Sequence, residues 1–182
     1  MIGYRHVDPR FAFLWETADQ PPARWHDVGE GPVQYLSSTP DAAWAEFLRH
    51  EEITDPADLA GVNRALWAVD IGPAPRVRPR LPGPTLAGDE STYDACRAEA
   101  RRLRQRGAVG LVAPSAAVDP QTGSGFRTDG GLRRARRAAE TVIVLFGRRP
   151  SLVGWAACAE GRPRADLLPR VRHFGPPAGP GR

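Results

Sequence analysis

The sequence contains no lysine, although 25 of its 182 residues are basic. This absence excludes Schiff-base chemistry and a lysine general base. Apart from histidine, every side-chain cation is an arginine, whose planar fork binds phosphates and carboxylates through paired hydrogen bonds. The formal net charge of +4 is modest and does not by itself indicate a nucleic-acid partner.

Cysteines and apolar runs are also scarce. Cys96 and Cys158 form no CxxC pair and have no flanking histidine, so the sequence predicts no metal site. Arg5, Asp8 and Arg10 interrupt the N-terminal region, and no long apolar run follows. These features predict a cytoplasmic protein with free thiols, without a signal peptide or a membrane segment.

The chain length fits one domain, which we expect to cover residues 1–174, followed by a disordered Gly/Pro-rich tail over residues 175–182. Arginines are dense at residues 97–106 and 133–137. Helical spacing explains the first cluster, and an exposed helix face is the expected place of the second, rather than an RNA contact.

Strands are expected to outnumber helices. Thr39-Pro40-Asp41 supplies an N-cap, a proline for the first helical position and an acid for the first turn, which predicts a helix to about residue 52. A second helix is expected to open at residues 89–91 and to end before Gly107. Strands are predicted at residues 33–36, 66–71, 110–115, 141–146 and 170–174. This irregular succession predicts an α+β fold with a mixed β-sheet core and a few helices.

Three residues of different chemistry lie on consecutive expected elements. Arg24 precedes the first predicted strand, Tyr35 lies in it, and Glu46 lies on the helix that follows. Glu46 falls outside the apolar arc of that helix, and the pattern permits two positions for its carboxylate. It is either exposed and paired with His50 one turn on, or it faces a cleft. Ser115 follows Pro114 at the end of another predicted strand, where a side chain can also face a cleft.

Five short segments, in their order and spacing, resemble the RES domain, which is named for its Arg, Glu and Ser. They are Tyr4-Arg5, Ala23-Arg24-Trp25, Gly31-Pro-Val-Gln-Tyr-Leu-Ser37, Ala43-Trp-Ala-Glu46 and Gly110-Leu-Val-Ala-Pro-Ser115. The RES domain is the toxin of RES/Xre toxin–antitoxin pairs. The resemblance implies a fold similar to that of ADP-ribosyltransferases, NAD as the substrate, and an Xre-type antitoxin as the partner.

The resemblance also implies roles for residues. Glu46 takes the position of the catalytic acidic residue, Arg24, Tyr35 and Ser115 take three further active-site positions, and Arg5 is an additional contact. The expected reaction removes nicotinamide from NAD by hydrolysis or phosphorolysis. Transfer of ADP-ribose to a protein or small molecule is the alternative within enzymes. If the protein is not an enzyme, the alternative is a catalytically inactive RES-like binding module that acts through its arginine clusters. A homodimer is also possible under each of these functions.

Physical chemistry independently fits these assignments. The diphosphate of NAD suits the guanidinium fork of Arg5 or Arg24, and the flat nicotinamide cation suits the electron-rich ring of Tyr35 or Trp25. Cleavage of the nicotinamide–ribose bond creates an oxocarbenium ion, which the Glu46 carboxylate would stabilise. Nicotinamide leaves readily, so a single carboxylate suffices. No histidine is placed by a motif to activate Ser115, which is therefore expected to orient the substrate rather than attack it.

Overall fold

The computed structural model describes residues 1–73, 77–119, 126–128, 130–134 and 140–174. A six-stranded sheet with the order β4-β7-β2-β1-β3-β8 forms its centre, and each of the five pairings is antiparallel. The strands of this sheet are β1 (Ile2–Val7), β2 (Val33–Ser37), β3 (Arg64–Asp70), β4 (Gly110–Pro114), β7 (Thr141–Phe146) and β8 (Val153–Gly161). The strands β5 (Phe126–Thr128) and β6 (Leu132–Arg134) form a separate hairpin.

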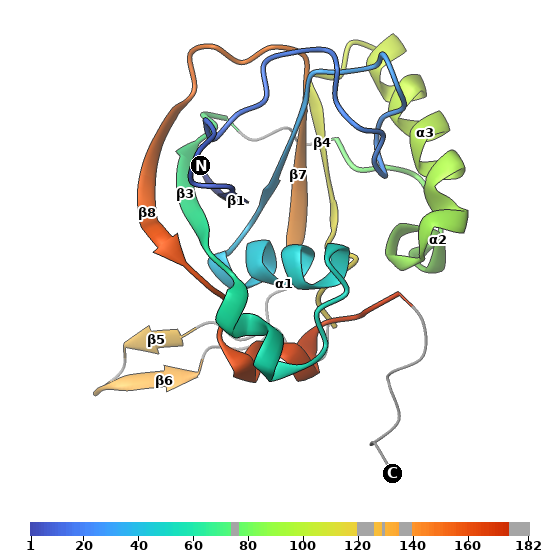
Figure 1. Ribbon diagram of the computed structural model, residues 1–182. Helices are drawn as coiled ribbons and strands as arrows, with labels where there is room; N and C mark the ends of the chain where they lie inside the picture. Colours follow the sequence, from blue (N-terminus) through green and yellow to red (C-terminus); the bar gives the residue numbers. More distant parts are fainter. Residues whose placement is uncertain (74–76, 120–125, 129, 135–139, 175–182) are drawn as a thin grey trace.

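Helices occupy one end and one side of this sheet (Figure 1). Helix α1 (Pro40–His50) crosses below the central strands, whereas α2 (Gly83–Ala87) and α3 (Tyr93–Gln105) lie on the β4 side, away from β8. Three short 3-10 helices complete the described elements: Pro56–Gly61, Glu90–Thr92 and Ala165–Arg170. The expected α+β class is therefore confirmed.

The sequence determines where α1 begins and which face it buries. The Thr39 hydroxyl accepts a hydrogen bond from the Ala42 amide at 3.1 Å, and Pro40 opens the helix. Trp44, Phe47 and Leu48 pack into a core cluster that also holds Leu167 and Leu168. The helix is thus held at both its cap and its apolar face, which fixes the side chains on its remaining face.

Two strands of the six-stranded sheet had no prediction from the sequence, and one predicted strand is wrong. Strands β1 and β8 were not expected, because neither has an uninterrupted apolar or cleanly alternating pattern. Residues 170–174 form no strand: Leu167 and Leu168 turn into the core through a 3-10 helix that contains Pro169, and afterwards only Val171 pairs, in an isolated bridge with Val118.

The second arginine cluster also differs from its expected structure. Arg133 lies in strand β6 and not on a helix face, while residues 135–139 and the expected tail at 175–182 lie outside the described residues. Strand β5 and helix α2 also had no prediction from the sequence.

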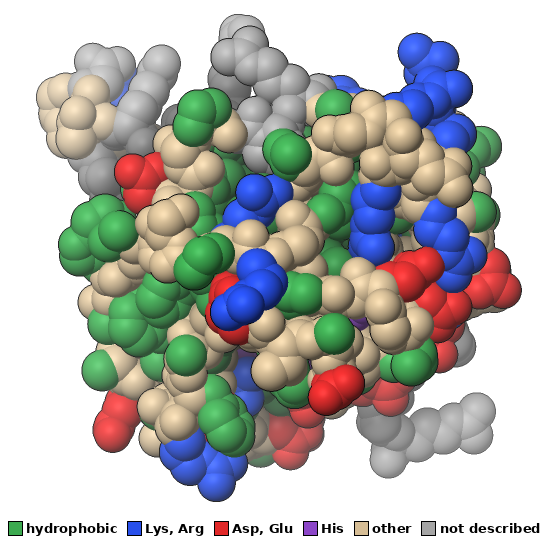
Figure 2. Space-filling view, turned by 90° about the horizontal axis from the view of Figure 1, so that it is seen from above, with side chains coloured by type: hydrophobic (Ala, Val, Ile, Leu, Met, Phe, Trp, Pro, Cys, Tyr) green, Lys and Arg blue, Asp and Glu red, His purple; other side chains and the backbone are tan. Residues whose placement is uncertain are grey.

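The surface is divided by chemistry. Figure 2 shows hydrophobic side chains gathered toward the β8 side of the upper face, and acidic and basic side chains toward the α3 side. Val153 and Trp155 on β8 are 54% and 55% exposed. Among the described residues, no helix is long and apolar enough to cross a membrane.

Candidate active site

A cleft opens where two neighbouring strands of the sheet separate. Strands β1 and β2 pair only at Tyr4 and Ser37, whereas β1 and β3 pair at six positions and β2 and β7 at five. A cavity of about 900 Å³ is lined by residues of both diverging strands, of α1 and of the loop that joins β1 to β2. This volume is in the usual range for sites that bind a small molecule or cofactor, roughly 300–1,000 Å³.

Glu46 faces this cavity from α1. Its side chain is half-buried, and its Oε1 accepts a hydrogen bond of 2.7 Å from the Ser115 hydroxyl. The contact joins residues 69 positions apart in the chain. The cleft-facing alternative for Glu46 is therefore the one that the structure shows, and its contact is Ser115 rather than His50.

Ser115 is held rigidly beside that carboxylate. It is 3% exposed, and its Oγ accepts hydrogen bonds from the amides of Ala117 at 3.2 Å and Val118 at 3.3 Å. Its own amide donates to the Glu140 carbonyl at 2.8 Å. Because the hydroxyl donates to Glu46 and both amides donate to its oxygen, the geometry fits a group that orients the carboxylate.

Arg24 lines the same cavity but is fixed by protein groups. It is 9% exposed, and its guanidinium donates to the Gly88 carbonyl at 2.6 Å, to the Thr92 hydroxyl at 3.2 Å and to the Thr85 carbonyl at 3.3 Å. The guanidinium carbon also lies 4.6 Å from the centre of the Tyr93 ring. A buried cation held in this way is preorganised, since little conformational freedom is lost when a substrate binds.

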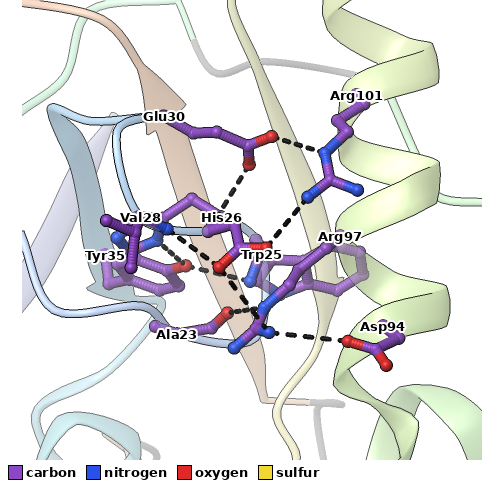
Figure 3. A network of polar contacts seen from close by, with 10 residues as sticks. Ala23, Trp25, His26, Val28, Glu30, Tyr35, Asp94, Arg97 and Arg101 are labelled. Atoms are coloured by element: carbon purple, nitrogen blue, oxygen red, sulfur yellow. Dashed lines mark hydrogen bonds and ion pairs between the residues drawn. The ribbon is translucent and has the colours of Figure 1, made fainter.

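Arginines of α3 bind the loop that carries Arg24 through hydrogen bonds and ion pairs (Figure 3). Arg97 donates to the Ala23 carbonyl at 3.0 Å. Arg101 pairs with Asp27 at 3.1 Å and also with Glu30. The first arginine cluster therefore contacts the protein itself, which accounts for its density without a nucleic-acid partner.

Tyr35 and Trp25 meet at the inner end of the same loop (Figure 3). The Tyr35 hydroxyl accepts a hydrogen bond from the Trp25 amide at 3.0 Å and lies 2.9 Å from His26 Nδ1. Burial raises the pKa of Tyr35, so its hydroxyl stays protonated. Tyr35 and Trp25 both line the cavity, but Trp25 is only 1% exposed and packs with Val33 in a core cluster.

Arg5 reaches the cavity from β1, where it donates to Gln34 Oε1 at 2.7 Å. The structure thus brings Arg5, Arg24, Tyr35 and Glu46 to one cavity, with Ser115 directly behind Glu46. Among the described residues, no group of three His, Cys, Asp or Glu side chains could hold a metal ion.

Several cavity residues had no prediction from the sequence. Arg49 is 4% exposed, donates to the carbonyls of Gly88 at 2.7 Å and Arg172 at 2.9 Å, and stacks 4.2 Å from the Phe174 ring centre. Its position three residues after Glu46 places it on the same face of α1, and this spacing was the available signal. Further examples are His6, Arg64, Tyr93 and Phe174.

The chain is similar to known proteins at the level of the family and of the fold. No curated protein matches the sequence. A chain in the crystal structure of the M. tuberculosis MbcT–MbcA toxin–antitoxin complex aligns with a TM-score of 0.61 and 16% identity, over 92% of this chain and 86% of that one. At this identity the likeness concerns the fold alone. The family model of the RES domain matches residues 3–157, a span that includes Glu46, Ser115 and the cleft between β1 and β2, and the chain therefore belongs to the RES domain family.

Proposed function

We propose that this protein consumes NAD by cleaving the nicotinamide–ribose bond, with water or phosphate as the acceptor. The observation that carries the proposal is the Glu46 carboxylate, oriented by Ser115 at 2.7 Å, in a cavity that also receives Arg24, Tyr35 and Arg5. RES membership supports an enzyme that acts on NAD.

Glu46 is the residue to which we assign charge stabilisation. As the carbon–nitrogen bond breaks, neutral nicotinamide leaves with the electron pair and positive charge develops on the ribose. A carboxylate beside the ribose stabilises that charge most strongly in the transition state, which lowers the barrier. Water or phosphate then bonds to the ribose carbon, and for water the released proton passes to solvent. The Ser115 proton, donated to Oε1, keeps the carboxylate in one orientation throughout.

Arg24 and Tyr35 are assigned to binding. The Tyr35 hydroxyl is already engaged by the Trp25 amide, so its contribution to the substrate is its ring and not its hydroxyl. We assign Trp25 to support of this ring, because its own side chain is in the core. Arg24 presents a fixed positive charge to the diphosphate of NAD.

We further propose that the protein is the toxin of a toxin–antitoxin pair, with an Xre-type antitoxin as its partner. The supporting observations are the family and the fold shared with a chain of the MbcT–MbcA complex. Cys96 and Cys158 are both free thiols, in agreement with a cytoplasmic site of action, where NAD is available.

The test is nicotinamide release from NAD by the purified protein, compared with Glu46→Gln, which removes the charge but keeps the shape. Release by the wild type, reduced by about 10³-fold in the variant, is expected, since one unit charge about 4 Å away is worth about 4 kcal/mol at a dielectric constant near 20. No release by the wild type, or equal release by both proteins, would contradict the proposal and favour a binding module. NAD labelled in its adenosine half separates the remaining outcomes: label in free ADP-ribose or its phosphate indicates hydrolysis or phosphorolysis, and label on a macromolecule indicates transfer.

A further inference from the structure

Two arginines in the cavity have neither a carboxylate nor a main-chain carbonyl as a partner among the described residues. Arg5 donates to the neutral amide oxygen of Gln34, and Arg64 donates to the neutral ring of His6. The Nε atom of Arg64 is buried and has no hydrogen-bond partner within the described part of the chain. Burial, together with the charge of Arg64, lowers the pKa of Arg5 to about 10. The two guanidiniums thus repel each other in a partly dehydrated place, which is unfavourable unless an anion joins them.

His6 directs Arg64 into this arrangement. His6 Nδ1 lies 3.4 Å from Arg64 Nη2, and because arginine can only donate, Nδ1 is the acceptor. Burial, with smaller contributions from Arg64 and Arg5, lowers the pKa of His6 to about 3, so the ring is neutral and its proton is on Nε2. Trp44 stacks on the ring at 6.2 Å, and Phe47 meets it edge-on at 5.0 Å. His6 therefore lines the cavity as a fixed neutral donor.

The acidic residues that line the cavity are engaged elsewhere. Asp8, which is close enough to Arg64 for its pKa to be affected, is paired with the exposed Arg10 at 2.7 Å. Glu16 is paired with Arg148 at 3.4 Å, and Glu46 accepts from Ser115. Each carboxylate thus has its own partner, and the positive charge of the Arg5–Arg64 pair is left for a ligand.

We propose that Arg5, Arg64 and His6 form an anion subsite that binds a phosphoryl group. The chemistry fits this group because two forked cations and one neutral donor match the several acceptor oxygens of a phosphate. The phosphoryl group can belong to the diphosphate of a dinucleotide substrate or to free phosphate. The assignment to a dinucleotide rests on the proposed function, whereas the anion subsite rests only on the geometry above.

The subsite is tested with inorganic phosphate and pyrophosphate in calorimetric titrations, without NAD. The variant is Arg64→Gln, and the matched control is Arg162→Gln, an exposed arginine that does not line the cavity. Wild type and control are expected to bind at least one of the two anions, and Arg64→Gln to bind it about tenfold or more weakly, the effect of losing one charge-assisted contact. Arg5→Gln provides a second variant with the same expected loss, and thermal unfolding shows that each variant is folded.

Equal anion binding by wild type and both variants would overturn the subsite, as would the absence of anion binding by the wild type. Anion binding that depends on Arg64, in a protein that releases no nicotinamide, would support the subsite and contradict only the proposed function. In an active enzyme, two kinetic arms identify the source. A KM increase in Arg64→Gln for NAD but not for nicotinamide riboside, which has no phosphate, assigns the subsite to the substrate. Loss of phosphate-stimulated nicotinamide release assigns it to free phosphate.

Discussion

The hydrogen bond between Ser115 and Glu46 provides a quantitative test of the proposed site. A hydrogen bond to a charged group is worth about 1.5–3 kcal/mol. Removing the hydroxyl in Ser115→Ala should therefore lower the rate of nicotinamide release by roughly 10- to 100-fold, because the 2.7 Å contact no longer orients the carboxylate. Glu46→Gln should lower it by about 10³-fold, through loss of the charge itself.

The two effects should not add. When Glu46 is already glutamine, the hydroxyl has no negative charge to orient, so adding Ser115→Ala should change the remaining rate by only about twofold. The assay is nicotinamide release by the wild type, the two single variants and the double variant, with kcat and KM measured separately. The reasoning is refuted if Ser115→Ala lowers nicotinamide release by the same factor in the Glu46→Gln background as in the wild type. Ser115 would then act independently of the carboxylate.

Stability must be measured in the same series. The Ser115 oxygen also accepts the Ala117 and Val118 amides, at 3.2 and 3.3 Å. Each buried amide left without a partner costs about 1–3 kcal/mol. Urea denaturation of Ser115→Ala should therefore show a lower free energy of unfolding, and the rates are compared per folded molecule.

Three further perturbations have defined outcomes. Tyr35→Phe removes the acceptor of the Trp25 amide and should lower the free energy of unfolding by about 1–3 kcal/mol in urea denaturation. Nicotinamide release per folded molecule of Tyr35→Phe should stay within about tenfold of wild type, because the ring remains, whereas Tyr35→Ala should lose more. Gly88→Ala places a Cβ 2.4 Å from Thr92 Cγ2, so either the Gly88 carbonyl or the Thr92 hydroxyl, both acceptors for Arg24, must move. Nicotinamide release should fall by up to about 10²-fold, and an unchanged rate would show that these acceptors do not position Arg24. The pKa of His6 is lowered from 6.5 to about 3, so the unfolded state binds more protons than the folded state between these two values. The stability that His6 contributes is therefore present above pH 6.5 and is lost as the pH falls, by up to about 1.4 kcal/mol per pH unit. The free energy of unfolding of His6→Asn should accordingly change less between about pH 6.5 and 4.5 than that of the wild type.

The sequence predicts correctly those helices and strands that have a local signal, such as a helix cap or an apolar run. The Thr39-Pro40 start of α1 and the apolar strand β7 are where the sequence places them, because a cap and an uninterrupted buried run are determined within a few residues. Strand β8 carries no such signal, because it forms an edge of the sheet and most of its side chains are exposed. Residues 170–174 have strand-like composition, but the packing of Leu167 and Leu168 below α1 decides their path.

The candidate site was predictable to the extent that its residues lie in motifs. The resemblance identifies Arg24, Tyr35, Glu46 and Ser115. The first three line the cavity, and Ser115 contacts Glu46. The direction of Glu46 was left open by periodicity, because a contact across 69 residues depends on the whole sheet. Arg64 had no motif at all, and its place beside β1 follows from the pairing of β3 with that strand.

The absence of lysine explains how so many cations can surround one cavity. Arg24 and Arg49 are both almost fully buried and both donate to the Gly88 carbonyl, at 2.6 and 2.7 Å. Burial, despite the opposing charge of Glu46, lowers the pKa of Arg49, but a guanidinium begins so far above neutrality that it stays charged. A buried lysine in the same place would deprotonate more readily, and it has three N–H donors on one nitrogen where arginine has five on a planar fork. The arginine composition thus keeps positive charge in the site while its hydrogen bonds tie the walls of the cavity together around Glu46.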